Sequence, residues 1–386
     1  MVIVHVLTRL LRAGSEENTL ATARAQVAAG HRVVIVFGRE WDATVRASAE
    51  AFAEVVCIEA MVHPIHPVQD PVAVRRMADL FKRLGADVVH THQSKAGVLG
   101  RLAARIARVP CVIHGVHILP FVNVGQVQAV VYVAAERFCA GFTDAFISVS
   151  PSVRDACIER SIGAPDRHFV AFSAMDVARF RDPVPPADGH ELLGVEAGRP
   201  RPPTAVMLAA FEPRKRQLEL IRAIPGAFAG LSDWRVLFAG EGETLAEARA
   251  LVDSLGLSDR IRFAGYRSDP QAIIALADVC LLTSLREGLP RVLVQYAAAG
   301  KPAVVSDLPG VTDVIEHDVS ALITPGDDVA AAAVATARLL ADPAERDRLA
   351  RGAARIDVEA WTADSMNAAI ARAYAAVAAR QIKLAA

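Results

Sequence analysis

Short runs of hydrophobic residues alternate with longer amphipathic stretches along almost the whole chain. In the first half, the runs rich in Val, Ile and Phe lack the polar alternation of a half-exposed strand, which is typical of parallel strands covered on both faces. These runs are residues 2–8, 32–38, 87–92, 110–116, 145–150 and 168–174. Amphipathic helices are predicted between them, at about 15–30, 71–84, 94–108, 124–141 and 151–162. This order predicts a doubly wound parallel sheet.

The pattern is interrupted once and then repeats. Residues 182–203 are rich in Pro, Gly and charge, and we interpret them as an interdomain linker. Six further strands are predicted at residues 204–211, 234–240, 261–266, 279–284, 303–307 and 321–325.

We therefore predict an α/β protein of two facing doubly wound, Rossmann-like domains with a cleft between them. The domains are residues 1–181 and 204–360, and a C-terminal helix, residues 361–386, is expected to return to the N-terminal domain. Ligands of such sheets bind at the carboxyl ends of the strands, so the loops there hold the candidate residues.

Composition excludes several classes of protein. A chain of 386 residues that is 53% hydrophobic is long enough for two packed cores. It contains no run of about 18 uncharged apolar residues, so no membrane span is expected, and its first residues are interpreted as a strand and not as a leader. The five cysteines are scattered, which favours neither a disulfide framework nor a zinc site and suggests a cytosolic compartment.

The net charge of −1 hides a mild asymmetry between the two halves. Residues 1–180 hold 19 Lys and Arg against 16 Asp and Glu, and the remainder holds 23 against 27. A slight positive excess favours an anionic partner for the first half, such as a membrane surface or a phosphate-bearing substrate. Arg101, Arg105 and Arg108 share one face of the predicted helix 94–108, which is either a solvated face or a docking surface for anionic lipid.

Two features lie at predicted strand ends of the first domain. Gly14 precedes Ser15, a residue that often caps a helix, and this loop either receives an anion at free backbone N–H groups or simply starts a helix. Four histidines close two strands, and no Asp, Glu or Cys joins them at ligand spacing, so hydrogen bonding in a polar cleft is favoured over a metal site. They are His90, His92, His114 and His117.

The second domain carries two polar loops. Arg214, Lys215 and Arg216 follow its first strand and either neutralise a diphosphate or form a solvated basic turn. In the stretch EGLPRVLVQ, Glu287 and Gln295 stand eight residues apart, a rise of about 12 Å if all are helical, so they could touch different parts of an elongated ligand.

The entry to this expected helix is itself a candidate anion site. Pro290 suits the first helical turn, which leaves the N–H groups of Gly288 and Leu289 free to face an anion.

Several motifs recur in a specific order: HTHQSKAG, AFISVSPSVRDA, EPRKRQLELIRAI, FAGEGE, LGLSDRIRFAGY and EGLP followed by AAAGKPAVVSDLPGVTDVI. In order and spacing they resemble the retaining glycosyltransferases of family 4, which have the GT-B fold, over nearly the whole chain. The HTHQSKAG segment is similar to the bacterial subgroup that builds envelope or exported polysaccharides, often on a polyprenyl-diphosphate lipid. The resemblance implies a UDP- or GDP-linked sugar donor and a glycan or lipid-linked acceptor.

The resemblance also implies roles for individual residues. His117, with His114 as second choice, would lie near the donor sugar, Lys215 would bind phosphate, and Glu287 would hold a hexose hydroxyl. The other donor-binding positions that it implies are Gly14, Ser15, Arg214, Tyr266, Arg267, Gly288, Leu289, Pro290, Val292 and Gln295. The acceptor positions are His92, Ser94 and Lys95. No metal, no cofactor beyond the nucleotide sugar and no nucleic-acid partner are expected.

The chain departs from the family pattern at three positions. Ala210 stands where the family often has Arg, and Arg214 is the candidate to supply that charge. Ala174 replaces a usual Gly. Gln295 replaces the second carboxylate of the E-x7-E pattern; its amide oxygen can still accept from a ribose hydroxyl, but without the added strength of a charge.

The resemblance implies retaining transfer in which the leaving phosphate accepts the acceptor's proton. The residues themselves identify no general base. We expect the protein in the cytoplasm, peripherally at the inner face of the cell membrane. Two alternatives stay open at this stage: a UDP-sugar epimerase on the same fold, and a catalytically impaired sugar-nucleotide-binding protein.

Overall fold

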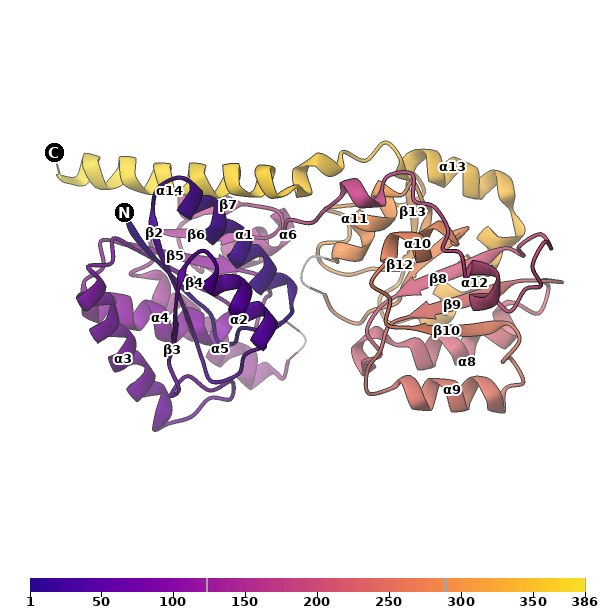
Figure 1. Cartoon of the computed structure of the whole chain (residues 1–386), viewed down its shortest axis with the longest axis horizontal. Helices are drawn as coiled ribbons and strands as arrows, with labels where there is room; N and C mark the ends of the chain where they lie inside the picture. The colour runs from indigo at the N-terminus through magenta and orange to yellow at the C-terminus, as the bar shows by residue number, and fades with distance from the viewer. Residues whose placement is uncertain (123, 288–289, 386) are drawn as a thin grey trace. The chain divides into compact units, whose positions relative to one another are not determined.

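The computed structural model describes residues 1–122, 124–287 and 290–385 and contains two compact units (Figure 1). Unit 1 consists of Met1–Met175 and Ala360–Ala386, and unit 2 of Asp176–Glu359. The first boundary precedes the expected one by six residues. The reason is that Phe180 is buried and Arg179 donates to the carbonyl of Ser268 in unit 2.

Unit 1 is built on a parallel sheet with the strand order β3-β2-β1-β4-β5-β6-β7. Its strands are β1 Val2–Val6, β2 Arg32–Phe37, β3 Glu54–Cys57, β4 Val88–His92, β5 Cys111–Val116, β6 Ala145–Ser148 and β7 His168–Val170. Its helices are α1 Gly14–Ala28, α2 Ala43–Glu50, α3 Gln69–Leu84, α4 Ser94–Ala107, α5 Gln126–Ala140, α6 Pro151–Glu159 and α14 Ala363–Ala385.

Alternate residues of these strands enter two separate cores. Ile3 and Ile113 pack with residues of α1 and α14, whereas Val4 and Val89 pack with residues of α3 and α4. Both faces of the sheet are covered, which explains the unbroken apolar runs in the sequence. The pair α2 and β3 was not predicted, because β3 is a half-exposed edge strand of four residues with a weak apolar signal.

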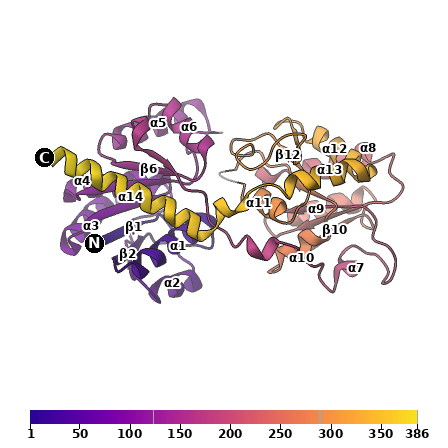
Figure 2. The same ribbon diagram turned by 90° about the horizontal axis from the view of Figure 1, so that it is seen from above.

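Helix α14 completes the first core. Met366, Ile370, Ala373 and Val377 recur at helical spacing and are buried beside residues of α1. Figure 2 shows α14 lying over the elements of unit 1. No helix within the described residues is long and apolar enough to cross a membrane.

Unit 2 repeats the architecture with the strand order β10-β9-β8-β11-β12-β13. The strands are β8 Thr204–Leu208, β9 Arg235–Ala239, β10 Ile261–Gly265, β11 Val279–Leu282, β12 Ala303–Ser306 and β13 Ala321–Thr324. The helices are α7 Gly189–Leu192, α8 Gln217–Ala227, α9 Leu245–Ser254, α10 Pro270–Ala275, α11 Arg291–Ala298, α12 Val329–Ala341 and α13 Pro343–Ala353.

All six strands predicted for the second half are observed, and the doubly wound fold is confirmed for both units. The expected linker is a packed part of unit 2, because Leu193 is fully buried and its carbonyl accepts a hydrogen bond of 3.0 Å from Arg235 Nε.

Candidate active site

Lys215 and Glu287 form an ion pair at the carboxyl edge of the unit 2 sheet. Lys215 lies in the short 3-10 turn Pro213–Lys215 that follows β8, and Glu287 lies in the loop after β11. Because β8 and β11 are neighbouring parallel strands, the loops that follow them meet. Both side chains are nearly enclosed, with 12% and 11% of their surfaces exposed.

Arg214 brings a second cation to the same carboxylate. Its Nη1 lies 3.3 Å from Glu287 Oε2, and its Nε lies 2.6 Å from Glu212 Oε2. Its guanidinium therefore bridges the carboxylates of Glu212 and Glu287. Arg216, the third cation of the run, is directed to another loop, where its Nη1 donates to the carbonyl of Gly326 over 2.8 Å.

Ser284 is a site residue that the sequence analysis missed. It is fully buried, and its hydroxyl donates to Glu287 Oε1 over 2.6 Å. Two further hydrogen bonds tie the loops together, from Thr283 Oγ1 to Lys215 O and from Leu285 N to Arg214 O. The signal that could have revealed Ser284 is its position as a small polar residue directly after an apolar strand.

Two glycines of the FAGEGE motif allow the loop after β9 to lie against the loop after β8. Gly240 and Gly242 both have φ of 151°, and an added Cβ would lie 2.0 Å from Ala209 O and 2.3 Å from Phe211 O, respectively. A larger residue at either position would displace the backbone that carries Arg214 and Lys215.

Helix α11 begins later than expected. It starts at Arg291, and Pro290 is its N-cap residue. The prediction of a helix from Glu287 to Gln295 is therefore wrong at both Glu287 and Pro290, which are described and lie outside the helix.

Two of the four other predicted residues near α11 are described by the structure. Gly288 and Leu289 lie outside the described residues. Val292 and Gln295 are half-buried on α11, and the Gln295 side chain makes no hydrogen bond within the described part of the chain.

Tyr266 and Arg267 have different surroundings. Tyr266 is 72% exposed. Arg267 lies between two carboxylates, with Nε 2.8 Å from Asp269 Oδ1 and Nη1 2.8 Å from Asp188 Oδ2. Hydrogen bonds raise the pKa of Arg267; the bond with Asp269 has the larger effect and the bond with Asp188 the smaller one. Arg267 thus ties the segment before α7 to the loop after β10 within unit 2, and Tyr266 is the accessible member of the pair.

In unit 1, the loop at Gly14 is organised by Gln93. Helix α1 starts at Gly14, so Ser15 is its second residue and not the N-cap that was expected. Gln93 Nε2 donates to Ser15 Oγ and to Glu16 Oε1, each over 3.1 Å, and Gln93 Oε1 accepts from Thr8 N over 3.2 Å. Gln93 has φ of 63° and ψ of 173°, a region used almost only by glycine.

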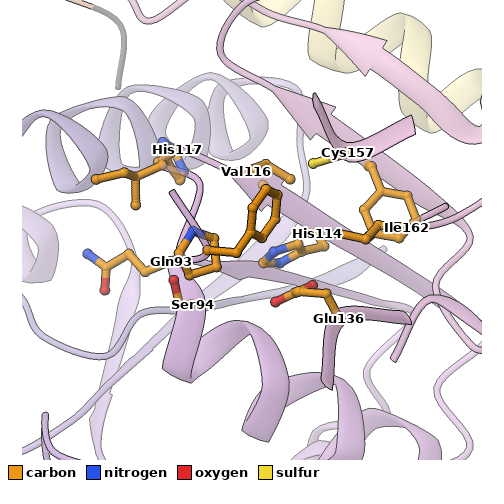
Figure 3. Close-up of a pocket in the computed structure, with 13 residues that line it drawn as sticks. Gln93, Ser94, His114, Val116, His117, Glu136, Cys157 and Ile162 are labelled. Carbon is orange, nitrogen blue, oxygen red and sulfur yellow. The ribbon is translucent and has the colours of Figure 1, made fainter. Parts of the chain in front are cut away.

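A small cavity of about 10 Å³ lies beside this loop, and His114 and His117 both line it (Figure 3). Gln93, Ser94 and Glu136 also contribute to its lining. Burial lowers the pKa of His114 well below its usual value, and the positive charge of Arg101 adds a smaller effect in the same direction. Burial also lowers the pKa of His117, to about 4. Both imidazoles are therefore neutral near pH 7.

The acceptor candidates differ in availability. Ser94 starts α4 and lines the cavity. Lys95 forms an ion pair with Asp70 at 2.6 Å. His92 is buried beneath the loops, and both its ring nitrogens are engaged by other histidines.

The basic face predicted for the helix at residues 94–108 is not a continuous surface. Arg101 is fully buried, and its Nη2 lies 2.6 Å from Glu136 Oε2 while its Nε donates to Gly97 O over 2.8 Å. The helical spacing was correct, but it does not reveal which face of a helix is buried.

His5, which the sequence analysis did not select, joins the histidine cluster. His5, His90 and His92 each bring one ring nitrogen within 4.8 Å of the others. The expectation of hydrogen bonding suits the geometry, because other side chains already engage both ring nitrogens of His5 and of His92.

Known proteins resemble this chain in both halves. The family described as Glycosyl transferases group 1 matches residues 194–355, and the Glycosyl transferase 4-like domain matches residues 13–172. The chain is 26% identical to the UDP-Gal:alpha-D-GlcNAc-diphosphoundecaprenol alpha-1,3-galactosyltransferase of Escherichia coli, over 70% of this chain and 71% of that protein. It is 30% identical to the putative glycosyltransferase EpsD of Bacillus subtilis, over 69% and 71%.

A solved structure with the same fold is that of Anabaena Alr3699/HepE in complex with UDP and glucose. It superimposes with a TM-score of 0.78 and 20% identity, and the match covers 97% of this chain and 100% of that one.

Proposed function

The chain belongs to the group 1 glycosyltransferases with a family-4-like N-terminal domain, and we propose that it transfers a sugar with retention from a nucleoside-diphosphate donor to an acceptor hydroxyl. The observation that carries this proposal is the convergence of Lys215 and Arg214 on Glu287 at the carboxyl edge of the unit 2 sheet. The matched families are transferases, and they give the epimerase alternative no support.

Donors from the described residues do not saturate the Glu287 carboxylate. An ionised carboxylate offers about four lone-pair positions. Ser284, Lys215 and Arg214 supply three donors to it. A hydroxyl of the transferred sugar is a suitable fourth donor, which supports the role proposed for Glu287.

The two cations suit the charge that develops in the reaction. The acceptor oxygen forms a bond to the anomeric carbon as the bond from that carbon to the phosphate oxygen breaks. The nucleoside diphosphate leaves with the bonding electrons and takes the acceptor's proton. Lys215 and Arg214 would stabilise the negative charge on the phosphates, and a scheme with these two cations requires no divalent metal.

The remaining predicted donor contacts keep their proposed roles: Gly14, Ser15, His114, Tyr266, Arg267, Gly288, Leu289, Pro290, Val292 and Gln295. We favour a UDP-linked donor and a lipid-linked or polysaccharide acceptor in cytoplasmic envelope-glycan synthesis. The names of the Escherichia coli relative and of the HepE complexes, with their UDP-galactose and UDP, support this choice.

The proposed contact with an anionic membrane is better supported on α5 than on α4. Val127, Val130 and Phe138 are 80%, 68% and 63% exposed on α5, and the only carboxylate of this helix, Glu136, is buried. The guanidinium of Arg105 lies over the ring of Phe142, which packs edge-on against Phe138. Apolar side chains bordered by arginines fit the headgroup region of an anionic bilayer.

Vesicle flotation tests this surface. The protein should float with vesicles that contain phosphatidylglycerol, and Val130→Glu should reduce the floated fraction several-fold. Val334→Glu, at a similarly exposed valine of unit 2, is the matched control and should float like the parent protein. Equal flotation with neutral vesicles would refute the electrostatic part of the proposal.

The catalytic assignment is tested by turnover. A panel of nucleotide sugars is first screened by thermal shift, and the stabilising donor is then assayed with lipid-linked and glycan acceptors. Lys215→Ala and Glu287→Ala should each lower kcat by about 100-fold or more. Glu247→Ala, at an exposed residue of α9, should not lower it. Near-wild-type turnover by both site variants would show that the assignment is wrong.

A further inference from the structure

A chain of hydrogen bonds runs through unit 1 from α1 to His117. Gln26 Oε1 lies 2.7 Å from His5 Nε2, His5 Nδ1 lies 2.9 Å from His92 Nε2, and His92 Nδ1 lies 3.0 Å from His117 Nε2. The imidazoles come from β1, the end of β4 and the residue after β5, which are adjacent strands of one sheet. The chain thus connects the interior of the unit to a residue of the candidate site.

Gly115 makes the last link possible. A Cβ at this position would lie 2.9 Å from His92 Nδ1 and 3.2 Å from His117 Nε2, the two atoms that form the hydrogen bond. The missing side chain therefore leaves the space in which these imidazoles meet.

The three imidazoles are neutral under ordinary conditions. Burial lowers the pKa of His5 and of His117 to about 4, and it lowers the pKa of His92 well below its usual value. A neutral imidazole carries one N–H and one bare nitrogen, so the proton position on one ring dictates the position on the next.

The Gln26 amide fixes the direction of the chain. Its oxygen can only accept, so His5 Nε2 carries the proton and His5 Nδ1 is bare. His92 Nε2 must then donate to His5, and His117 Nε2 must donate to the bare Nδ1 of His92. His117 Nδ1 is consequently left without a proton.

Tyr374 is a further neighbour of the Gln26 amide. Tyr374 of α14 is buried, which raises its pKa, and a hydrogen bond from Gln26 opposes that rise. The amide oxygen is the Gln26 atom that lies 2.7 Å from His5 Nε2. The Tyr374 hydroxyl in turn lies 3.0 Å from His90 Nδ1, to which it can donate.

We propose that Gln26, His5 and His92 are positioning residues that hold His117 as the Nε2–H tautomer, with its Nδ1 ready to accept a hydrogen bond from a substrate hydroxyl. His117 is only partly buried and lines the cavity beside Gln93 and Ser94, and its Nδ1 has no hydrogen bond within the described residues. The tautomer follows from the hydrogen-bond chain alone, whereas the hydroxyl ligand rests on the proposed function.

Nitrogen NMR of protein labelled with 15N-histidine tests the tautomer without substrate, with the His117 signals assigned by their loss in His117→Asn. The wild type should show an unprotonated Nδ1 and a protonated Nε2 for His117. Gln26→Glu keeps an acceptor toward His5 and should keep this pattern. Gln26→Met removes the acceptor and should give averaged signals of both tautomers. Thr22→Val, one helical turn away in the same helix, is the control and should behave like the wild type.

Three results would overturn the proposal: a protonated His117 Nδ1 in the wild type, an unchanged His117 signal in Gln26→Met, or a stoichiometric metal ion that disappears in His5→Asn. Gly115→Ala offers a second break in the chain if Gln26→Met does not fold, and it should also mix the tautomers.

Steady-state kinetics then test whether the tautomer of His117 matters for the reaction with substrate. Gln26→Met should lower kcat/KM about fivefold, the value of one neutral hydrogen bond, and Gln26→Glu should restore most of it. If the tautomer changes while kcat/KM stays at the wild-type value, the role toward substrate is refuted. If no nucleotide sugar is turned over by the wild type, the proposed function fails while the NMR result stands.

Discussion

Ser284 donates a 2.6 Å hydrogen bond to Glu287, so the carboxylate that meets Lys215 and Arg214 is also held from its own loop. A hydrogen bond to a charged group contributes about 1.5–3 kcal/mol, and this one restricts the rotamer of Glu287.

We expect Ser284→Ala to lower kcat about tenfold or more, because Glu287 would no longer be held in the geometry that suits the sugar hydroxyl. Steady-state kinetics with the identified donor measure the effect. Ser254→Ala, at an exposed helix end in the same unit, is the control. An unchanged kcat would mean that the two cations alone position Glu287.

Gln295→Glu should bind the donor nucleotide more tightly, by about three- to tenfold. The carboxylate adds charge to a hydrogen bond with a ribose hydroxyl, and the Gln295 side chain gives up no hydrogen bond within the described residues. Titration calorimetry of the nucleoside diphosphate measures the change. Weaker binding by the variant would show that position 295 does not contact the ribose.

Unit 1 should lose stability as the pH falls from about 6.5 toward 4. Burial lowers the pKa of His5 and His117 to about 4, while the unfolded chain takes up protons near 6.5, so the unfolded state binds more protons within this window. The free energy of unfolding should then decrease by up to about 1.4 kcal/mol per pH unit for each such histidine, and these groups should have no effect above the window.

Urea unfolding at several pH values measures this slope. In a Trp234→Phe background, the remaining tryptophans, Trp41 and Trp361, both belong to unit 1 and report on it selectively. His5→Phe should give a shallower slope, with replacement of the exposed His63 as the control. A slope that His5→Phe leaves unchanged would contradict the argument.

Unit 1 should lose stability when only one partner of the buried Arg101–Glu136 ion pair is replaced. Glu136→Gln should destabilise unit 1 by about 3–5 kcal/mol, because it leaves the Arg101 charge buried without its counter-ion. Arg101→Met combined with Glu136→Leu should recover most of this loss. The same fluorescence measurement compares the single and double variants, and a double variant no more stable than Glu136→Gln would refute the account.

The sequence predicts the fold well because apolar runs report directly on strands covered on both faces. The family resemblance also selected Lys215 and Glu287 as donor contacts, and the structure places them in the loops after the neighbouring strands β8 and β11. Contacts that depend on side-chain direction could not be predicted from the sequence. Nothing local shows that His5 contacts Gln26, 21 residues later, or that the Arg101 side chain is buried. The start of α11 was also misplaced: Pro290 was expected within the first turn, where proline is common, but it stands at the N-cap, one residue before the helix.

At position 93, the backbone conformation lowers stability while the side chain organises the loop at Gly14. Its positive φ costs on the order of 1–3 kcal/mol, a cost that glycine would largely avoid. Glycine would also remove the amide that joins Thr8, Ser15 and Glu16. A selection for thermostability alone would therefore favour Gln93→Gly. The selected variant should have a higher free energy of unfolding and a lower kcat than the parent protein.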